Sequence, residues 1–113
     1  MVSQGDIIAI NFSPTQGHEQ SGYRPAVVIS RDLYNINTGF VVVCPITSTA
    51  KLFPARVSLD SRTATVGDIL CDQIRTFDLT VRSYKLIEKV PEDIMSKVIC
   101  IVVSIFDDFS NDL

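Results

Sequence analysis

The sequence predicts one mainly β domain: a small, strongly bent sheet or barrel followed by a single C-terminal helix. Six short apolar segments, rich in β-branched residues and separated by turn residues, are typical of strands. The long apolar segment with helical spacing comes last, after residue 91. A length of 113 residues is that of one domain, spanning 1–113.

The first half of the chain predicts three strands, at residues 7–12, 25–30 and 40–46. The third is rich in β-branched residues, so we expect it to be buried on both faces. A polar loop at 13–22 joins the first two strands, and a loop of that length more often serves function than forms a simple hairpin. For the connection at 31–39 we expect one helical turn.

The second half predicts strands at 56–59, at 67–74 and at 83–90. Pro91, followed by two acidic residues, is a typical helix start. The β-branched run that ends at Phe106 is also compatible with a strand. A helix this apolar is either covered by its own sheet or packs on a second chain. Its apolar residues at helical spacing are Ile94, Val98, Ile101, Val102, Ile105 and Phe109.

The composition is that of a folded protein, because 46% of the residues are hydrophobic and 20% are charged. The net charge of −3 is unevenly distributed. Residues 1–90 carry nine basic and eight acidic residues, whereas residues 91–113 carry one basic and five acidic residues. The nearly neutral body is compatible with a nucleic-acid partner but argues against strong nonspecific binding to phosphate backbones.

Several classes of protein are disfavoured by the motifs that the sequence lacks. Three cysteines without a CxxC pair argue against a disulfide framework or a zinc knuckle, and a single histidine excludes paired-histidine metal motifs. Glycine-rich nucleotide-binding motifs are also missing, so we expect neither metal nor cofactor. The N-terminal residues do not resemble a secretory signal, and the longest uncharged apolar run is too short to span a bilayer. We therefore expect a cytoplasmic protein without membrane contact.

The densest polar cluster is the predicted first loop, GHEQSGYRP at residues 17–25. It contains His18, Glu19 and Arg24, with two glycines and a proline that restrict the backbone. Phosphodiester chemistry uses such a set: a base takes the attacking proton, an acid protonates the leaving oxygen, and a cation stabilises the phosphorane charge. Spacing alone favours the alternative, an ordinary solvated loop with an Arg–Glu pair.

Two further polar clusters follow predicted strands. Three hydroxyl residues at 47–49 come after the buried third strand, where they either bind a phosphate or, more commonly, cap a turn. Asp72 and Arg75 lie in the strand-like segment 71–78. They form either a surface ion pair or, if they face a groove, a pair that positions RNA.

Four stretches of the chain carry a family resemblance. They are GDIIAINFSPTQGHEQSGYRPAVVIS at 5–30, FVVVCPITST at 40–49, GDILCDQIRTFD at 67–78 and KVPEDIM at 89–95. In this order they resemble the MazF/PemK/Kid toxins of bacterial toxin–antitoxin modules, nearly from end to end. The resemblance, and not the spacing, favours a catalytic role for the first loop.

This resemblance implies a small SH3-like β-barrel, the PemK/Kid/MazF toxin fold, with short helical connections and a C-terminal helix, acting as a homodimer. Family members are sequence-specific, metal-independent endoribonucleases that cut single-stranded RNA, mostly mRNA, and so inhibit translation and growth. The 2′-hydroxyl attacks the adjacent phosphorus and leaves a 2′,3′-cyclic phosphate and a 5′-hydroxyl. An antitoxin inhibits them by covering the RNA groove with an acidic, disordered tail, and operator DNA is contacted only through the antitoxin.

The MazF branch of the family places catalysis on Glu19, Arg24 and Thr47. By this resemblance Glu19 is the general base for the 2′-hydroxyl, Arg24 is the cation on the nonbridging oxygens, and Thr47 hydrogen-bonds the phosphate. Arginine is a poor proton donor because its pKa exceeds about 12, so His18 is a candidate general acid. The choice between His18 and Arg24 stays open, as does a role for His18 limited to orienting Glu19 or contacting a base.

The Kid branch instead uses a histidine in the first loop with an aspartate and an arginine on the fifth strand. His18 and Asp72 match two of these positions, but Leu70 stands where the arginine would be, which favours the MazF set. We expect further RNA contacts from Ser48, Arg56, Asp72, Gln73 and Arg75. Tyr23 and Phe53 are candidates for stacking on a base, as in other single-strand binders, or for packing.

Two other functions compete with this interpretation. A CcdB-like DNA gyrase poison has the same broad fold but acts without catalysis, and the first loop, which belongs to the ribonuclease branch, argues against it. A non-catalytic SH3-like binding module is the second alternative. Loss of Arg24 or Thr47 would indicate such a module, and the chain retains both.

Overall fold

The computed structural model describes residues 1–12, 22–49 and 54–106 of the chain. These residues form seven strands and two helices: β1 (Asp6–Asn11), β2 (Tyr23–Val28), α1 (Asp32–Thr38), β3 (Phe40–Thr47), β4 (Arg56–Ser58), β5 (Asp68–Leu70), β6 (Arg75–Asp78), β7 (Tyr84–Lys89) and α2 (Glu92–Phe106). Neither helix of this part of the chain is both long and apolar enough to cross a membrane. The predicted mainly β fold with a C-terminal helix is confirmed.

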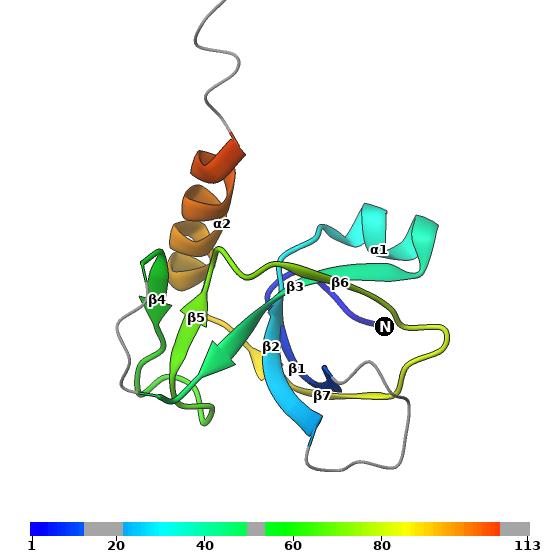
Figure 1. Cartoon of the computed structure of the whole chain (residues 1–113), viewed down its shortest axis with the longest axis horizontal. Helices are drawn as coiled ribbons and strands as arrows, with labels where there is room; N and C mark the ends of the chain where they lie inside the picture. The colour runs from blue at the N-terminus through cyan, green and yellow to red at the C-terminus, as the bar shows by residue number, and fades with distance from the viewer. Residues whose placement is uncertain (13–21, 50–53, 107–113) are drawn as a thin grey trace, which may run out of the picture.

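Strand β3 is the central strand of the sheet, because three other strands pair with different parts of it. Its first residues pair with β6, its middle pairs with β2, and its end pairs with β5, all antiparallel. The main path runs β4–β5–β3–β2–β1–β7, with β6 joined to β3 off this path. Within the described residues this path is open, so the bent sheet describes the fold better than a closed barrel (Figure 1).

Two hydrophobic cores lie on opposite faces of the central strands. The helix-side core consists of Ile7, Val27, Ile29, Cys44, Ile46, Val57, Ile69, Cys71, Val90, Ile94 and Val98. The opposite core consists of Val2, Ile8, Ile10, Ala26, Val28, Val41, Val43 and Phe77. Strand β3 contributes to both, because successive side chains of a strand alternate between faces. The prediction that β3 is buried on both faces is therefore confirmed.

One predicted strand was wrong in extent. The segment 67–74 does not form one strand, because β5 ends at Leu70 and a turn follows before β6 starts at Arg75. The turn is held by hydrogen bonds from the Gln73 amide to the Leu70 carbonyl (3.3 Å) and from the Cys71 amide to the Ala55 carbonyl (2.9 Å). Both β5 and β6 run antiparallel along β3, and the register shifts by three residues between them, so residues 71–74 bulge out between two strands that follow the same neighbour.

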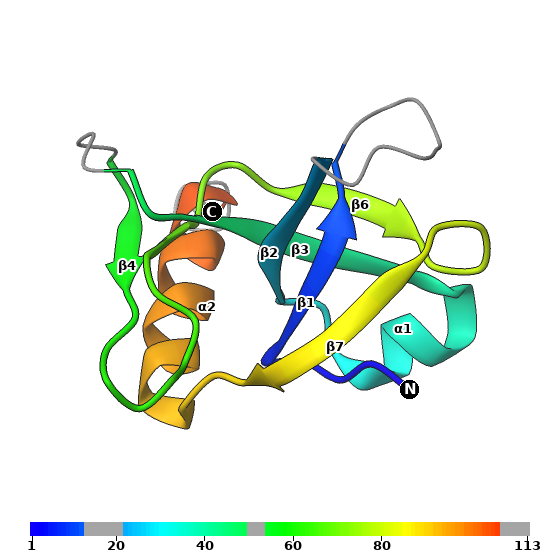
Figure 2. The ribbon, with the colours of Figure 1, turned by 90° about the horizontal axis from the view of Figure 1, so that it is seen from below.

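The C-terminal segment is a helix, which excludes the strand alternative. Helix α2 lies beside β4 at one end of the molecule, and α1 lies at the other end (Figures 1 and 2). Ile94 and Val98 are buried in the helix-side core, whereas Val103, Ile105 and Phe106 are exposed. The sheet therefore covers only the first half of the helix, and its last turns present an apolar surface.

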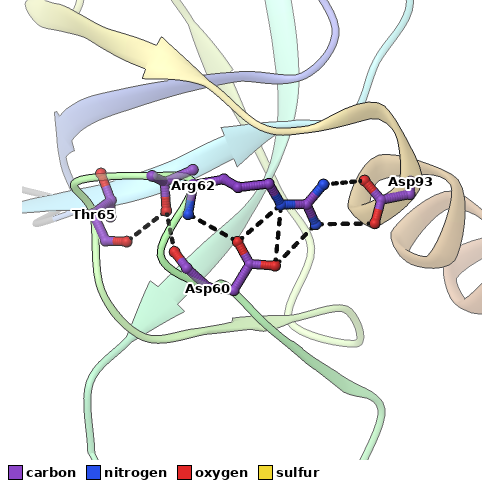
Figure 3. A network of polar contacts seen from close by, with 5 residues as sticks. Asp60, Arg62, Thr65 and Asp93 are labelled. Atoms are coloured by element: carbon purple, nitrogen blue, oxygen red, sulfur yellow. Dashed lines mark hydrogen bonds and ion pairs between the residues drawn. The ribbon is translucent and has the colours of Figure 1, made fainter.

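A polar network ties the loop between β4 and β5 to the start of α2 (Figure 3). The Arg62 guanidinium forms ion pairs with the carboxylates of Asp60 and Asp93, each at 2.8 Å. Hydrogen bonds from Arg62 lower the pKa of Asp60 to about 2 and also lower the pKa of Asp93. Beside this, the Glu88 carboxylate accepts hydrogen bonds from the amide (2.7 Å) and the hydroxyl (2.7 Å) of Thr65, which lower its pKa. The hairpin is thus fixed to both α2 and β7.

Candidate active site

A groove of about 610 Å³ lies where β2, the end of β3 and the β5–β6 turn meet. Its lining residues are Phe12, Gly22, Arg24, Pro45, Ile46, Thr47, Leu70, Asp72, Gln73, Ile74 and Arg75. Five of the predicted site residues therefore come together here from separate parts of the chain: Arg24, Thr47, Asp72, Gln73 and Arg75. Two arginines and one aspartate among them favour an anionic ligand.

Arg24 reaches the groove from the second position of β2. Its backbone pairs with Ile10 of β1, and its side chain is exposed to solvent. The β1–β2 ladder is extended by a hydrogen bond from the Phe12 amide to the Gly22 carbonyl (3.2 Å). Because β1 and β2 pair regularly up to this end of the ladder, the backbone of Arg24 is fixed, although its side chain is exposed to solvent.

Thr47 is the last residue of β3 and lines the groove from the strand next to β2, since Ala26 of β2 pairs with Pro45 of β3. Its backbone pairs with Asp68 of β5. Its hydroxyl oxygen accepts a hydrogen bond from the Thr49 amide (3.2 Å), a local turn that Ser and Thr commonly make. While it accepts this bond, the hydroxyl can still donate its own proton to another group, such as a phosphate oxygen.

Arg75 lies on the groove wall in contact with aromatic rings. Its guanidinium carbon lies 5.5 Å from the ring centroid of Phe12 and 5.2 Å from that of Phe77, which is cation–π geometry. The two rings meet edge to face at 5.1 Å. Arg82 lies over Phe77 at 4.8 Å and donates to the Asn11 carbonyl (2.5 Å). These contacts keep the Arg75 guanidinium beside the groove.

Two buried thiols lie close to the groove but are unsuited to catalysis. Burial raises the pKa of Cys44 to about 12 and that of Cys71 to about 11. Both thiols are therefore protonated at neutral pH, and a thiol is a poor nucleophile. In the described part of the chain, side chains of His, Cys, Asp and Glu do not gather into a group that could hold a metal ion.

Other predicted site residues lie apart from the groove lining. Arg56 forms an ion pair with Asp68 and lines a different hollow between β4 and α2. Ser48 is exposed directly after β3, and Tyr23 precedes Arg24 on β2, where alternation turns it to the other face. The predictions for His18, Glu19 and Phe53 fall outside the described residues.

Five apolar residues of the groove were missed by sequence reasoning: Phe12, Pro45, Ile46, Leu70 and Ile74. Each stands within or beside a predicted strand, where an apolar residue is usually part of the core. Phe12 did have a signal, because it directly precedes the polar loop at 13–22. An aromatic ring next to such a loop is a candidate for ligand contact.

Comparison with known proteins gives consistent matches. The chain matches the family of PemK-like, MazF-like toxins of type II toxin–antitoxin systems over residues 3–106. It is 39% identical over 102 residues to the endoribonuclease PemK of Escherichia coli, covering 87% of this chain and 77% of that protein. It is also similar to the endoribonuclease toxin MazF of Escherichia coli strain K12, at 42% identity over 64% of each chain.

Solved structures agree with the sequence matches. MazF from Deinococcus radiodurans has a TM-score of 0.79 at 36% identity, covering 92% of this chain and 94% of that one. The MazE–MazF complex from the same organism has a TM-score of 0.79 at 30% identity, covering 94% and 95%.

Proposed function

Because the chain belongs to the family of PemK-like, MazF-like toxins of type II toxin–antitoxin systems, we propose that it is an endoribonuclease that cuts single-stranded RNA. One observation carries this proposal. A single groove gathers two arginines, a threonine, an aspartate and a glutamine, contributed by β2, β3 and the β5–β6 segment. The proteins related to this chain include ones named as endoribonucleases.

In the proposed reaction the nucleophile belongs to the substrate. The RNA 2′-oxygen forms a bond to the adjacent phosphorus while the bond from phosphorus to the 5′-oxygen breaks, which leaves a 2′,3′-cyclic phosphate and a 5′-hydroxyl. Glu19 takes the proton of the 2′-hydroxyl. Arg24 stabilises the charge that grows on the nonbridging oxygens, and the Thr47 hydroxyl donates a hydrogen bond to the same phosphate. The proton for the leaving oxygen comes from His18 or Arg24.

The shape of the groove supports a single-stranded substrate. Phe12 and the stacked Arg75 form one wall, and bases stack on aromatic rings and on guanidinium planes only when they are unpaired. Asp72 and Gln73 lie at the turn beside this wall, where a carboxylate and an amide can accept from or donate to base edges. We propose that this end of the groove recognises the RNA sequence that is cut, and that the RNA is mostly mRNA.

We also propose two protein partners. The first is a second copy of the chain, because the exposed Val103, Ile105 and Phe106 of α2 present apolar surface that pairing would cover. The second is a cognate antitoxin, as in the MazE–MazF complex of a related protein. An acidic segment of the antitoxin would compete with RNA for the groove arginines and would carry any operator DNA contact. We place this activity in the cytoplasm, where mRNA is translated.

A cleavage assay on a long, unstructured RNA in excess EDTA tests the proposal. The wild-type chain and Arg24→Ala are compared, and both product ends are mapped. Discrete cuts with cyclic phosphate ends, missing in the variant, are the expected result. A folded, antitoxin-free protein that leaves the RNA intact would contradict the proposal and favour a gyrase poison, which a topoisomerase assay would then test.

A further inference from the structure

An ion pair crosses the β4–β5 hairpin next to Thr47. The Arg56 guanidinium on β4 contacts the Asp68 carboxylate on β5, and the two side chains are 25% and 11% exposed. In the hairpin Asp68 pairs with Ser58, while Arg56 pairs with Leu70, so the ion pair is diagonal. On its other side, Asp68 pairs with Thr47. Asp68 thus links the charged side chain of Arg56 on β4 to Thr47 at the end of β3.

The residue before Asp68 packs directly on the Thr47 backbone. A Cβ atom placed on Gly67 would lie 2.4 Å from the carbonyl oxygen of Thr47 and 2.9 Å from its carbonyl carbon. Gly67 also has a φ of +136°, a conformation that other residues rarely adopt. The start of β5 and the end of β3 are therefore in contact backbone to backbone, so a displacement of Gly67 or Asp68 reaches Thr47.

We propose that Arg56 and Asp68 form a positioning pair that holds Thr47 in the geometry needed for catalysis, and that Arg56 is not itself a major RNA contact. This inference rests on the proposed endoribonuclease function. The Asp68 carboxylate is largely buried, and a charge-assisted contact to a planar guanidinium is directional as well as strong. Leu70 on the same strand lines the groove, so the hairpin is part of the groove wall.

Positioning and RNA contact predict different kinetics. If Arg56 contacts RNA, its loss raises KM and reduces the salt dependence of binding, because one phosphate contact is lost. Neutralising Asp68 would then release Arg56 and tighten RNA binding. If the pair positions Thr47, loss of either partner lowers kcat and leaves KM nearly unchanged, since misplacing a group by a fraction of an ångström acts on the transition state.

The test measures kcat and KM for Asp68→Asn, Arg56→Gln, Arg56→Lys and Thr47→Ala, and for the double variant Thr47→Ala with Asp68→Asn. We expect Asp68→Asn and Arg56→Gln to lower kcat by about tenfold or more with KM changed by less than about twofold. Arg56→Lys should recover part of the loss because it keeps the charge. In the Thr47→Ala background, Asp68→Asn should cause no further loss of kcat.

A control and a spectroscopic measurement separate positioning from general destabilisation. Arg62→Ala removes another ion-paired arginine of the same hairpin, away from the groove, and should leave kcat unchanged. The amide of Thr49 donates to the Thr47 hydroxyl, so its hydrogen exchange should accelerate in Arg56→Lys and Arg56→Gln while amides of β1 keep their protection.

The possible outcomes distinguish a failure of the positioning proposal from a failure of the proposed endoribonuclease function. Unchanged kcat in Asp68→Asn and Arg56→Gln, with Thr47→Ala impaired, would overturn the positioning pair but leave the endoribonuclease proposal in place. Tighter RNA binding in Asp68→Asn would also overturn it. RNA left intact by the wild-type chain would instead contradict the proposed function. If Asp68→Asn does not fold, the two Arg56 variants decide the question by the same kinetic comparison.

Discussion

The guanidinium of Arg75 lies 5.5 Å from the ring centroid of Phe12, and both residues line the groove. This contact joins two segments that are far apart in the sequence, the end of β1 and the start of β6. Attraction between the ring and the cation keeps a positive charge next to an aromatic ring at the groove, and both groups are of a kind that bases stack on.

Substitutions of Arg75 separate its charge from its shape. Arg75→Lys keeps the charge but loses the plane, so we expect RNA binding to weaken severalfold with an unchanged salt dependence. Arg75→Gln should weaken binding and also reduce the slope of log K against log salt by about 1. Binding is measured with a single-stranded oligonucleotide in which 2′-deoxy sugars remove the nucleophile. Equal slopes for the two variants would contradict a phosphate contact.

Arg24→Ala and Glu19→Ala should each remove most cleavage activity without unfolding the protein. Arg24 is exposed on a strand whose backbone pairing does not depend on its side chain, so the free energy of unfolding should change by about 0.5 kcal/mol or less. The matched control is Tyr23→Phe, one residue away on the other face of β2. Full cleavage by Arg24→Ala would exclude the assigned role.

His18→Asn tests which group donates the final proton. If His18 is the general acid, the alkaline limb of the pH–rate profile reports its deprotonation and should disappear in the variant. Arg24 then only stabilises charge. An unchanged profile with slightly lower activity would instead remove His18 from the proton transfer and leave it a role in orientation or base contact.

Acid should destabilise the protein through the carboxylates around the β4–β5 loop. The pKa of Asp60 is lowered from 3.8 to about 2, chiefly by hydrogen bonds from Arg62, and those of Asp93 and Glu88 are lowered as well. Because the folded pKa lies below the unfolded one, the stabilisation is complete above about pH 4 and is lost as the pH falls toward 2. Urea midpoints measured from pH 5 to pH 2 should therefore decrease. Arg62→Ala should flatten this decrease, and an unaltered pH dependence in that variant would contradict the role of Arg62.

Ile69 should be among the most sensitive core positions. It is fully buried on β5 between Ile46 and Val57, where its neighbours cannot collapse freely into a void. Ile69→Val should cost about 0.5–1.5 kcal/mol of unfolding free energy and Ile69→Ala about 2–5 kcal/mol. The control, Val66→Ala, changes a residue that is 76% exposed and should lie within about 0.5 kcal/mol of the wild type. Denaturant titration measures all three.

The fold was predictable where neighbouring residues decide the structure. Strands β1 and β3 follow from runs of β-branched residues, and α2 follows from the proline and acidic residues at its start. Strand β6 lies within the segment 71–78 that the sequence marked as strand-like, but its pairing with the far end of β3, more than thirty residues away, could not be predicted from local pattern. The bulge that separates β5 from β6 is visible only as a register shift along β3, which local pattern does not show either.

Five polar residues that the sequence singled out, Arg24, Thr47, Asp72, Gln73 and Arg75, line one groove, and their roles in catalysis and RNA binding stay predictions. The apolar walls of the groove were not predictable. Whether Arg56 contacts RNA depends on the face of β4 on which its side chain lies. Strand β4 has only three residues, which is too short for the sequence pattern to predict that face. Apolar residues such as Leu70 have the same pattern whether they line a groove or fill a core.

Strand β3 contributes to both hydrophobic cores and ends in Thr47, one wall of the groove. A strand shared in this way does not detach alone, because its release exposes apolar surface on two sides at once. We therefore expect the groove to be lost only when the domain unfolds as a whole. Activity and the lifetime of the toxin in the cell are therefore linked. A variant that loses activity because it is unstable also becomes a substrate for proteases. A variant that loses activity through a substitution of Arg24 stays folded and continues to bind its partners.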